Sequence, residues 1–444
     1  MCGVGEDEYV CKESECRKFT EDCPALILSI FILVVLSLYW AVLFHVDRNM
    51  HSLVTYIVDF DSQLPPYQST TPLIGPMVTQ LTEQINSSPG PHLGFVTLPP
   101  SHFNNDPIAV RQAVYDFHAW AAVIINANAT TNLQQAVQTG NSQYDPLGAA
   151  QIIYVQAREQ DTYNSYVLPQ LNTLQQQITS MLGEIWVAPT LANTSIPREN
   201  LQRASQALSP AVSFSMFNLR PFGPAVATPA VTIGLIYLII ISFFSFSFFM
   251  PTHMKLLSPN PAEGKPPMRF PQWILWRWSA TTMAYLIMSL FYSLISLAFQ
   301  IPFANPPASQ VEVAVNPTAY GRGTFPVFWM INFIGMAALG LACENVAMLI
   351  GQPWTAMWLI FWVISNVSTS FYSLDMTPKF YYWGYAWPLH QVVEASRSTL
   401  FDLHSRIGLN FGVLFAWVAV NSALFPACCY FTKWKQERAK RKQI

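Results

Sequence analysis

The chain has 444 residues, of which 52% are hydrophobic and only 11% charged, whereas an ordinary globular protein has about 25% charged residues. Its 23 Lys and Arg nearly balance its 25 Asp and Glu, so the formal net charge is −2. So little charge cannot solvate the surface of several soluble domains, and the balance provides no basic field for a nucleic acid. The composition indicates a membrane protein and excludes nucleic acid as a partner.

Uncharged windows as long as a bilayer crossing occur along the chain. The first, Pro24–Phe44, would form a helix about 31 Å long, enough for a hydrocarbon layer of about 30 Å. It has no clear small-residue cleavage site, so we predict an uncleaved signal anchor. A soluble core rarely repeats such helices, and the sequence predicts a polytopic α-helical membrane protein with six transmembrane helices. The five later windows are Ala225–Met250, Trp278–Phe299, Phe325–Cys343, Trp354–Leu374 and Leu409–Phe431.

Lys and Arg are retained on the cytosolic side of a membrane and therefore predict the orientation. The C-terminal tail from Lys433 to Lys442 is basic, and the loop Pro251–Trp278 has four basic residues, including Arg277. With six crossings, both termini are then cytosolic. The predicted organisation is an acidic, cysteine-containing cytosolic tail (1–23), a first transmembrane helix (24–44), a large extracytoplasmic domain (45–224), a five-helix transmembrane bundle (225–431) and a basic cytosolic tail (432–444).

The extracytoplasmic domain alternates strand-like and helix-like segments. Thr71 before Pro72, and Asp106 before Pro107, each place a capping side chain ahead of a proline at the first helical position. Apolar residues recur every three or four positions over 167–185, which predicts a long amphipathic helix. The resulting order favours an α/β fold with a largely parallel sheet. The predicted strands are Leu53–Phe60, His92–Leu98, Trp120–Ala127 and Gln151–Val155.

Three N-x-[ST] sequons lie in this domain, at Asn86, Asn128 and Asn193, and predict N-glycosylation during passage through a secretory lumen. The domain contains no cysteine, so its fold does not depend on disulfides.

The cysteines lie instead near the predicted cytosolic side. Juxtamembrane Cys23, Cys428 and Cys429 are candidates for S-palmitoylation. The alternative is that each is a small apolar residue facing lipid. The N-terminal tail has no C-x-x-C pair, and no metal site is predicted.

Several segments resemble the fungal nitrosoguanidine-resistance membrane protein family. The resemblance rests on Val114–Leu133, Tyr144–Pro146, Asn218–Phe222, Gly340–Glu344 and Tyr382–Arg397, and it extends from about Asn49 to Phe431. It implies one crossing, a large outer domain and five further crossings, in the manner of the permease subunits of type-2 ABC exporters. It also implies a role in tolerance of toxic small molecules at the plasma membrane, but no catalytic residue can be transferred.

The common catalytic motifs are absent from the sequence. The one Gly-Lys pair, Gly264-Lys265, precedes Pro266, so no G-x-x-x-x-G-K-[ST] motif is present and any pump needs a separate energy-coupling protein. No H-E-x-x-H or G-x-S-x-G occurs either. We therefore expect neither an enzyme nor a cofactor.

Ionisable residues near the membrane are the candidates for a substrate path, because their burial requires a partner. Glu344 ends the fourth crossing and could face a cavity, or it could be an interfacial carboxylate at a helix end. His390, Glu394 and Arg397 share one helical stripe between the fifth and sixth crossings. This stripe could line an exit path, or its helix could simply pack on its neighbours with Glu394 paired to Arg397.

Asp59 and Asp61 follow the first predicted strand, where they could bind an extracytoplasmic ligand or an ion. The alternative is that both are turn residues, since Asp is common where a strand ends.

The leading hypothesis is a plasma-membrane protein of exporter-permease type that contributes to tolerance or efflux of toxic amphiphilic molecules. The alternative is a non-transporting organiser or regulator of lipid distribution that acts through partner proteins; a membrane-tethered enzyme is the third. Expected partners are membrane lipids, amphiphilic small molecules, a second copy of the chain, by analogy with exporter permeases, and an energy-coupling or regulatory protein.

Overall fold

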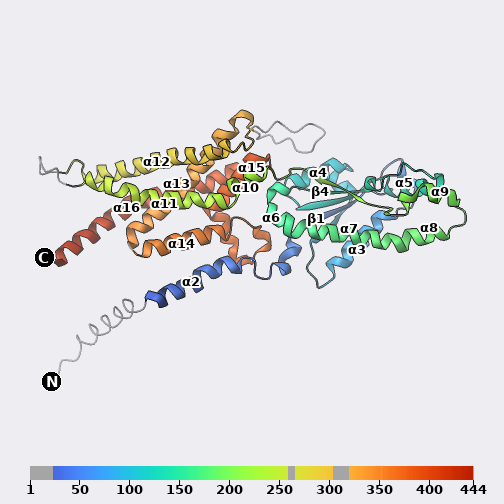
Figure 1. The fold of residues 1–444 in the computed structure, drawn as a ribbon, viewed down its shortest axis with the longest axis horizontal. Coiled ribbons are helices and arrows are strands. Elements are labelled where there is room, and N and C mark those ends of the chain that lie inside the picture. The colour runs from blue at the N-terminus through green and yellow to red at the C-terminus, as the bar shows by residue number, and fades with distance from the viewer. Residues whose placement is uncertain (1–23, 259–265, 304–319, 352, 444) are drawn as a thin grey trace, which may run out of the picture.

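The computed structural model describes residues 24–258, 266–303, 320–351 and 353–443. They form an α/β domain and a helical bundle that lie end to end along the longest axis of the molecule (Figure 1). The C-terminal end of the last helix lies at the end of the bundle far from the α/β domain (Figure 1).

The α/β domain is built on a sheet of five strands in the order β2-β1-β3-β4-β5. Neighbouring strands are parallel except for the antiparallel pair β3 and β4. All residues of the central β3 are buried, which accounts for its uninterrupted apolar sequence. The four predicted strands and the largely parallel sheet are confirmed, whereas β5 was not predicted. The strands are β1 (Val54–Asp59), β2 (Gly94–Leu98), β3 (Ala121–Ile125), β4 (Ala150–Tyr154) and β5 (Phe214–Asn218).

Helices cover this sheet, and their starts test the predicted caps. Asp106 caps α4, since its carboxylate accepts a hydrogen bond from the Ile108 amide at 2.8 Å. The prediction for Thr71 is wrong, because α3 begins at Ile74 and its first amides bond instead to the carboxylate of Asp61, which follows β1. The helices are α3 (Ile74–Asn86), α4 (Pro107–Tyr115), α5 (Ala129–Thr139), α6 (Gln160–Thr162), α7 (Leu168–Leu182), α8 (Ala188–Ala192) and α9 (Arg198–Arg203).

The predicted amphipathic helix is α7, and it buries Leu171, Leu174, Ile178 and Leu182 as its spacing requires. Ile185 is exposed, contrary to the pattern. A turn of π-helix over Gly183–Val187 explains the difference, because its wider winding rotates later side chains off the apolar face.

The other side of the sheet shares its core with the bundle. Val58 and Ile124 of the sheet and Val110 of α4 belong to one buried cluster with Phe328 and Phe401, which come from helices of the bundle. The junction between the two parts is therefore a packed apolar interface rather than a linker.

In the bundle, α13 is the central helix and packs against α11, α12, α14, α15 and α16. Within the part of the chain that the structure describes, five helical segments are long and apolar enough to cross a membrane: Ala25–Ser52, Ala225–Lys255, Phe270–Ala298, Gly321–Ile350 and Ile407–Lys435. The chain is thus a polytopic helical membrane protein. The helices are α2 (Pro24–Ala41), α10 (Thr228–Val231), α11 (Ile236–Lys255), α12 (Phe270–Ala298), α13 (Thr324–Ile350), α14 (Trp354–Val367), α15 (Pro388–Phe401) and α16 (Ile407–Gln443).

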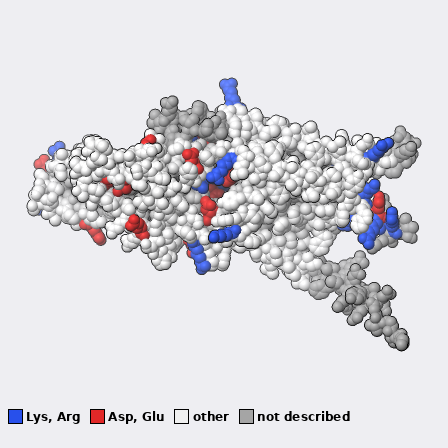
Figure 2. Space-filling view, turned by 180° about the vertical axis from the view of Figure 1, so that it is seen from behind, with Lys and Arg blue, Asp and Glu red and all other residues white. Residues whose placement is uncertain are grey.

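The charged surface agrees with this reading. On the face drawn in Figure 2, charged side chains gather at the junction with the α/β domain, and basic ones gather at the far end of the bundle. Between these two zones the surface is uncharged, as a lipid-facing belt must be.

A sixth long transmembrane helix is not confirmed, because α14 covers only part of the predicted window Trp354–Leu374. Its 14 residues span about 21 Å, less than a hydrocarbon layer of about 30 Å. The hydroxyls of Ser368, Thr369 and Ser370 hydrogen-bond to carbonyls one turn earlier, which competes with continuation of the helix. The chain nevertheless returns to the α/β domain after α14, since Asp375 lies 3.4 Å from the indole nitrogen of Trp120.

Two predicted loop or tail segments are helical. Arg277 belongs to α12, where it is only 2% exposed, and so the prediction that it lies in a cytosolic loop is wrong. The predicted tail 432–444 continues α16 as far as Gln443.

Candidate functional site

The α/β domain and the bundle are joined at α15 and the segment after it by polar contacts. The side chains of Arg397 and Glu159, and of Arg220 and Asp402, are 12% exposed or less, so solvent screens these two pairs only weakly. Among the described residues, the ion pairs Arg397–Glu159 at 3.3 Å and Arg220–Asp402 at 2.9 Å cross the junction, and His404 Nδ1 lies 3.2 Å from an oxygen of the Asp116 carboxylate.

A cavity of about 250 Å³ lies at this junction. Its walls come from the turn between α4 and β3, from the loop after β4 and from the chain between α14 and α15. The rest of the wall is formed by α15, the segment after it and the start of α16. The lining residues are Phe117, Trp120, Arg158, Glu159, Ser370, Tyr372, Ser373, Leu374, Asp375, Tyr385, His390, Glu394, Arg397, Ser398, Leu403, His404, Arg406 and Asn410.

Both signs of charge and several aromatic rings line the cavity. Its cations are Arg158, Arg397 and Arg406 and its carboxylates are Glu159, Asp375 and Glu394. The Arg158 guanidinium lies 3.7 Å from the ring centroid of Trp120 and 4.5 Å from that of Phe117, a geometry that orients a cation by its attraction to the ring faces. Burial raises the pKa of Glu159, although the nearby charge of Arg397 offsets part of this effect.

His390 and Glu394 form a coupled pair on α15, with His390 Nε2 3.4 Å from Glu394 Oε1 and His390 Nδ1 2.9 Å from the Thr369 carbonyl. Burial by itself lowers the pKa of His390, but the Glu394 carboxylate outweighs it, so the pKa is above the ordinary 6.5. For Glu394, burial favours a higher pKa, but His390 and Asn410 lower it to about 2. Each side chain therefore favours the charged form of the other.

This pair should give a pH-dependent stability difference between the natural chain and Glu394→Gln. The contribution of Glu394 is present above the ordinary pKa of 4.5 and is lost as pH falls towards about 2. The contribution of His390 to stability is present below its ordinary pKa of 6.5, and it is lost as the pH rises through the raised pKa of His390 in the folded chain. We expect the difference, about 1–2 kcal/mol because Glu394 is 35% exposed, to be largest between these two ordinary values.

The measurement is the melting temperature of both chains in detergent from about pH 2 to about pH 9, because the contribution of Glu394 is lost only as the pH falls towards about 2. Glu83→Gln, an exposed substitution on α3, is the matched control and should show no such maximum. A difference between the natural chain and Glu394→Gln that does not change with pH would contradict the pairing.

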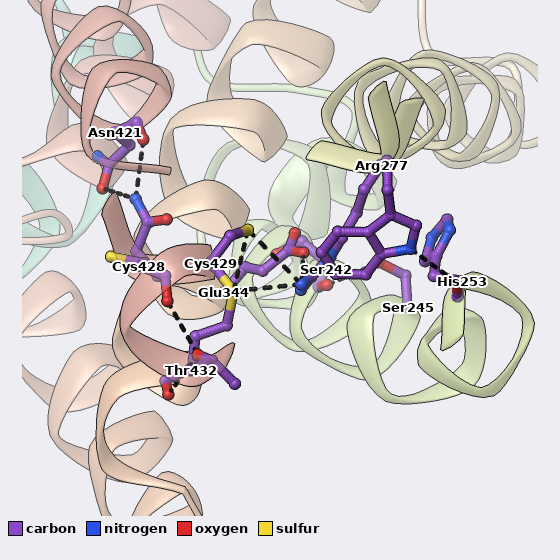
Figure 3. A network of polar contacts seen from close by, with 12 residues as sticks. Ser242, Ser245, His253, Arg277, Glu344, Asn421, Cys428, Cys429 and Thr432 are labelled. Carbon is purple, nitrogen blue, oxygen red and sulfur yellow. Dashed lines mark hydrogen bonds and ion pairs between the residues drawn. The ribbon is translucent and has the colours of Figure 1, made fainter. Parts of the chain in front are cut away.

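The structure brings three of the predicted path residues together and separates the fourth. His390, Glu394 and Arg397 all line the junction cavity, but Glu394 pairs with His390 and not with Arg397. Glu344 lies inside the bundle, where its Oε1 accepts a hydrogen bond from Arg277 at 2.5 Å (Figure 3). Glu344 therefore lies apart from the junction cavity, and a role of these four side chains in a substrate path stays a prediction.

Asp61 has a structural role that the sequence did not indicate. Its buried carboxylate accepts hydrogen bonds from the amides of Ile74, Gly75 and Thr130, at the first turns of α3 and α5. Asp59 packs against Gly75 and accepts a hydrogen bond from the Asp61 amide at 2.8 Å. Burial raises the pKa of Asp59 to about 6. A ligand at Asp61 would have to displace protein donors, whereas Asp59 also lines a shallow open pocket.

The predicted modification sites differ in accessibility. Asn193 is exposed beyond α8, whereas the Asn86 side chain exchanges two hydrogen bonds with the backbone of Phe95. Asn128, half-buried, lines a separate polar pocket. Cys428 and Cys429 are buried in the bundle, so an acyl transferase would need them to be exposed first; Cys23 lies outside the described residues. Glycosylation and palmitoylation stay predictions.

Arg158, Glu159 and Asp375 were not among the predicted site residues. Arg158 and Glu159 follow a buried strand with a single short turn between, a position where charged residues often serve a site at the edge of a sheet, and this was the available signal. Among the described residues, no group of three His, Cys, Asp or Glu side chains could hold a metal ion.

Comparison with known proteins places most of the chain in one family. A family model described as "Protein of unknown function (DUF3533)" matches residues 24–423. The uncharacterized endoplasmic reticulum membrane protein YJR015W of Saccharomyces cerevisiae is 24% identical over 437 residues, which cover 94% of this chain and 80% of that protein. No solved structure matches the chain. Neither name mentions nitrosoguanidine, so that resemblance stays a prediction.

Proposed function

Because the chain belongs to the DUF3533 family, whose function is unknown, its role must be argued from its geometry, and we propose a membrane protein of exporter-permease type. In this proposal it accepts amphiphilic molecules from the membrane and passes them to the side occupied by the α/β domain. Tolerance of toxic amphiphiles would follow from this activity.

The junction cavity is the observation that carries the proposal. It lies where the uncharged belt of the bundle meets the charged zone beside the α/β domain (Figure 2). An amphiphile at that level keeps its tail in lipid and needs a site for its polar head. Arg158 and Arg406 offer cations, Asp375 and Glu394 offer carboxylates, and the exposed Tyr385 offers an aromatic ring, a set suited to a head with both charges.

The topology in this proposal keeps the α/β domain outside the cytosol and both termini inside. Two observations support it: the basic far end of the bundle, and the return of the chain towards the α/β domain after α14. Protease protection of a tag beside Asn128, with cleavage of a tag beside Lys440, is the expected result in intact cells or vesicles. Exposure of both tags to one compartment would contradict it.

We propose the plasma membrane as the site of action. The name of the yeast relative places that protein in the endoplasmic reticulum, which is the alternative compartment for this chain. Fluorescence microscopy of the tagged full chain distinguishes the two.

The transport test is reconstitution of the full chain in liposomes that contain a fluorescent lysophosphatidylcholine. Its movement between leaflets, measured by accessibility to dithionite, should be faster than in protein-free liposomes. Arg158→Gln, which removes a head-group cation, should slow this movement about tenfold, the kinetic equivalent of one charge-assisted hydrogen bond. Ser398→Phe, which fills the cavity from α15, should also slow it.

Arg198→Gln on the exposed α9 is the matched control and should transport like the natural chain. Because the sequence lacks a nucleotide-binding motif, the assay is repeated with membrane extract and ATP. Rates equal to those of protein-free liposomes under both conditions would exclude the permease.

A second candidate, a non-transporting organiser of lipid distribution, is favoured by one observation. Among the described residues, the cavity at the junction and the cavity at the far end of the bundle share no lining residue, and the packed α13 lies between these ends. Under this reading, the chain binds the labelled lipid without moving it, and purification from native membranes recovers a stoichiometric partner protein.

A further inference from the structure

A second cavity, of about 490 Å³, opens at the end of the bundle far from the α/β domain. It lies between the C-terminal part of α11, the N-terminal part of α12 and the C-terminal part of α16. It has no part in the function proposed for the junction cavity, and of the predicted site residues only Cys429 lines it.

One wall of this cavity is apolar and adaptable. It is lined by Met250 and Met254 of α11 and by Met268, Phe270 and Trp273. Methionine side chains are unbranched and flexible, so they can pack along a hydrocarbon chain without a fixed shape. The wall therefore suits an extended apolar tail.

Cations occupy the rest of the lining. Arg269, Arg277 and Lys433 line the cavity together with one carboxylate, Glu437, which lies 3.9 Å from Lys433. Glu344 stands behind Arg277 and pairs with it. Three cations against two carboxylates leave one positive charge in excess, which a single negative charge on a ligand would neutralise.

Arg277 has hydrogen-bonding capacity that the protein does not use. Its Nη2 donates to Glu344, whereas Nη1 meets two sulfur atoms, Met348 Sδ at 3.2 Å and Cys429 Sγ at 3.9 Å (Figure 3). Sulfur is a weak acceptor. Among the described residues, the Arg277 Nε has no hydrogen-bond partner, although the side chain is only 2% exposed. Such a buried donor is costly unless another acceptor reaches it.

We propose that this cavity binds a long-chain fatty acid. The hydrocarbon chain lies along the methionine and aromatic wall, and the carboxylate faces Arg277, with Lys433 at the rim. A carboxylate supplies the acceptor that Arg277 lacks and the one negative charge that balances the site. A neutral lipid would fill the same space, but it would leave the Arg277 donor without a charged acceptor and the excess positive charge without a counter-charge.

The test is native mass spectrometry of the full chain, purified in a non-ionic detergent, with palmitate or methyl palmitate as the probe. We expect one saturably bound palmitate, and binding of the ester at least about tenfold weaker, since the ester lacks the charge. The comparison needs no variant, so it does not depend on the folding of a mutant. Equal binding of the acid and the ester would overturn the proposal.

Two variants locate the site. Met254→Trp fills the cavity and should abolish palmitate binding while the Arg277–Glu344 pair remains. Lys433→Glu reverses a charge on a side chain that is 48% exposed, so the fold should tolerate it, and palmitate binding should weaken about tenfold. Arg322→Gln, on an exposed residue at the opposite end of α13, is the matched control. Unchanged binding by Met254→Trp and Lys433→Glu, with both chains folded, would overturn the assignment.

Discussion

Replacing Asp61 with Ala should lower the stability of the α/β domain by about 3–5 kcal/mol, among the largest effects of a single substitution. The side chain is 0% exposed. Its carboxylate accepts the amides of Ile74 at 3.2 Å, Gly75 at 3.3 Å and Thr130 at 3.0 Å, and the Thr130 hydroxyl at 2.5 Å. Alanine would leave the amides of Gly75 and Thr130 without this acceptor and would remove a negative charge from two helix N-termini, although the Ile74 amide keeps the Thr130 hydroxyl as a second acceptor at 3.2 Å.

The measurement is thermal unfolding of the full chain, together with the rate of trypsin cleavage within the α/β domain. Asp106→Ala, which removes an exposed cap from α4, is the matched control and should cost only about 1 kcal/mol. Asp61→Asn, which keeps the shape but not the charge, should lie between the two. A stability of Asp61→Ala equal to that of the control would contradict this role for Asp61.

Local sequence patterns were sufficient to predict the strands β1 to β4 and the helix α7. The apolar run of β3 and the three-to-four spacing of α7 each express burial within one element, and both can be read without knowing its neighbours. The strand Phe214–Asn218 carries no such signal, because only Phe214 of its five residues is buried. Pairing with β4, rather than its own composition, makes this segment a strand.

The predicted crossing 354–374 is only partly helical for a related reason. Hydropathy shows that residues 354–374 lack charge, but it contains no information on hydrogen bonds. In the structure, Ser and Thr hydroxyls donate to backbone carbonyls one turn earlier in the helix. Asn366 adds a further constraint, since its Oδ1 accepts the amide of Leu389 at the start of α15 at 3.1 Å. The end of α14 is thus determined by polar side chains within an apolar window.

The candidate site was only partly predictable because its residues come from distant parts of the chain. The stripe His390, Glu394 and Arg397 was visible as helical spacing within α15. The ion-pair partner of Arg397 could not be predicted in this way, since Glu159 is 238 positions away from Arg397 in the sequence. Local spacing suggested Glu394 as the partner of Arg397, but the tertiary fold supplies another carboxylate.

Glu344→Gln should destabilise the bundle by about 3–5 kcal/mol, since it leaves the charge of Arg277 buried without its partner. Both side chains are 2% exposed, and they are 2.5 Å apart. Arg277→Met alone should cost a similar amount, because the Glu344 carboxylate is then unpaired. The double variant Arg277→Met with Glu344→Gln removes both charges and should recover most of the loss.

The measurement is a double-mutant cycle on the melting of the full chain in detergent without added fatty acid. The exposed pair Lys433–Glu437, with side chains 48% and 55% exposed, is the matched control and should show a coupling of less than about 1 kcal/mol. Additive losses for Arg277 and Glu344 would mean that the two charges do not compensate each other. Recovery in the double variant would show that the ion pair does not increase the stability of the bundle over an uncharged pair. A ligand site that needs a buried cation at Arg277 would then explain why the chain contains the pair.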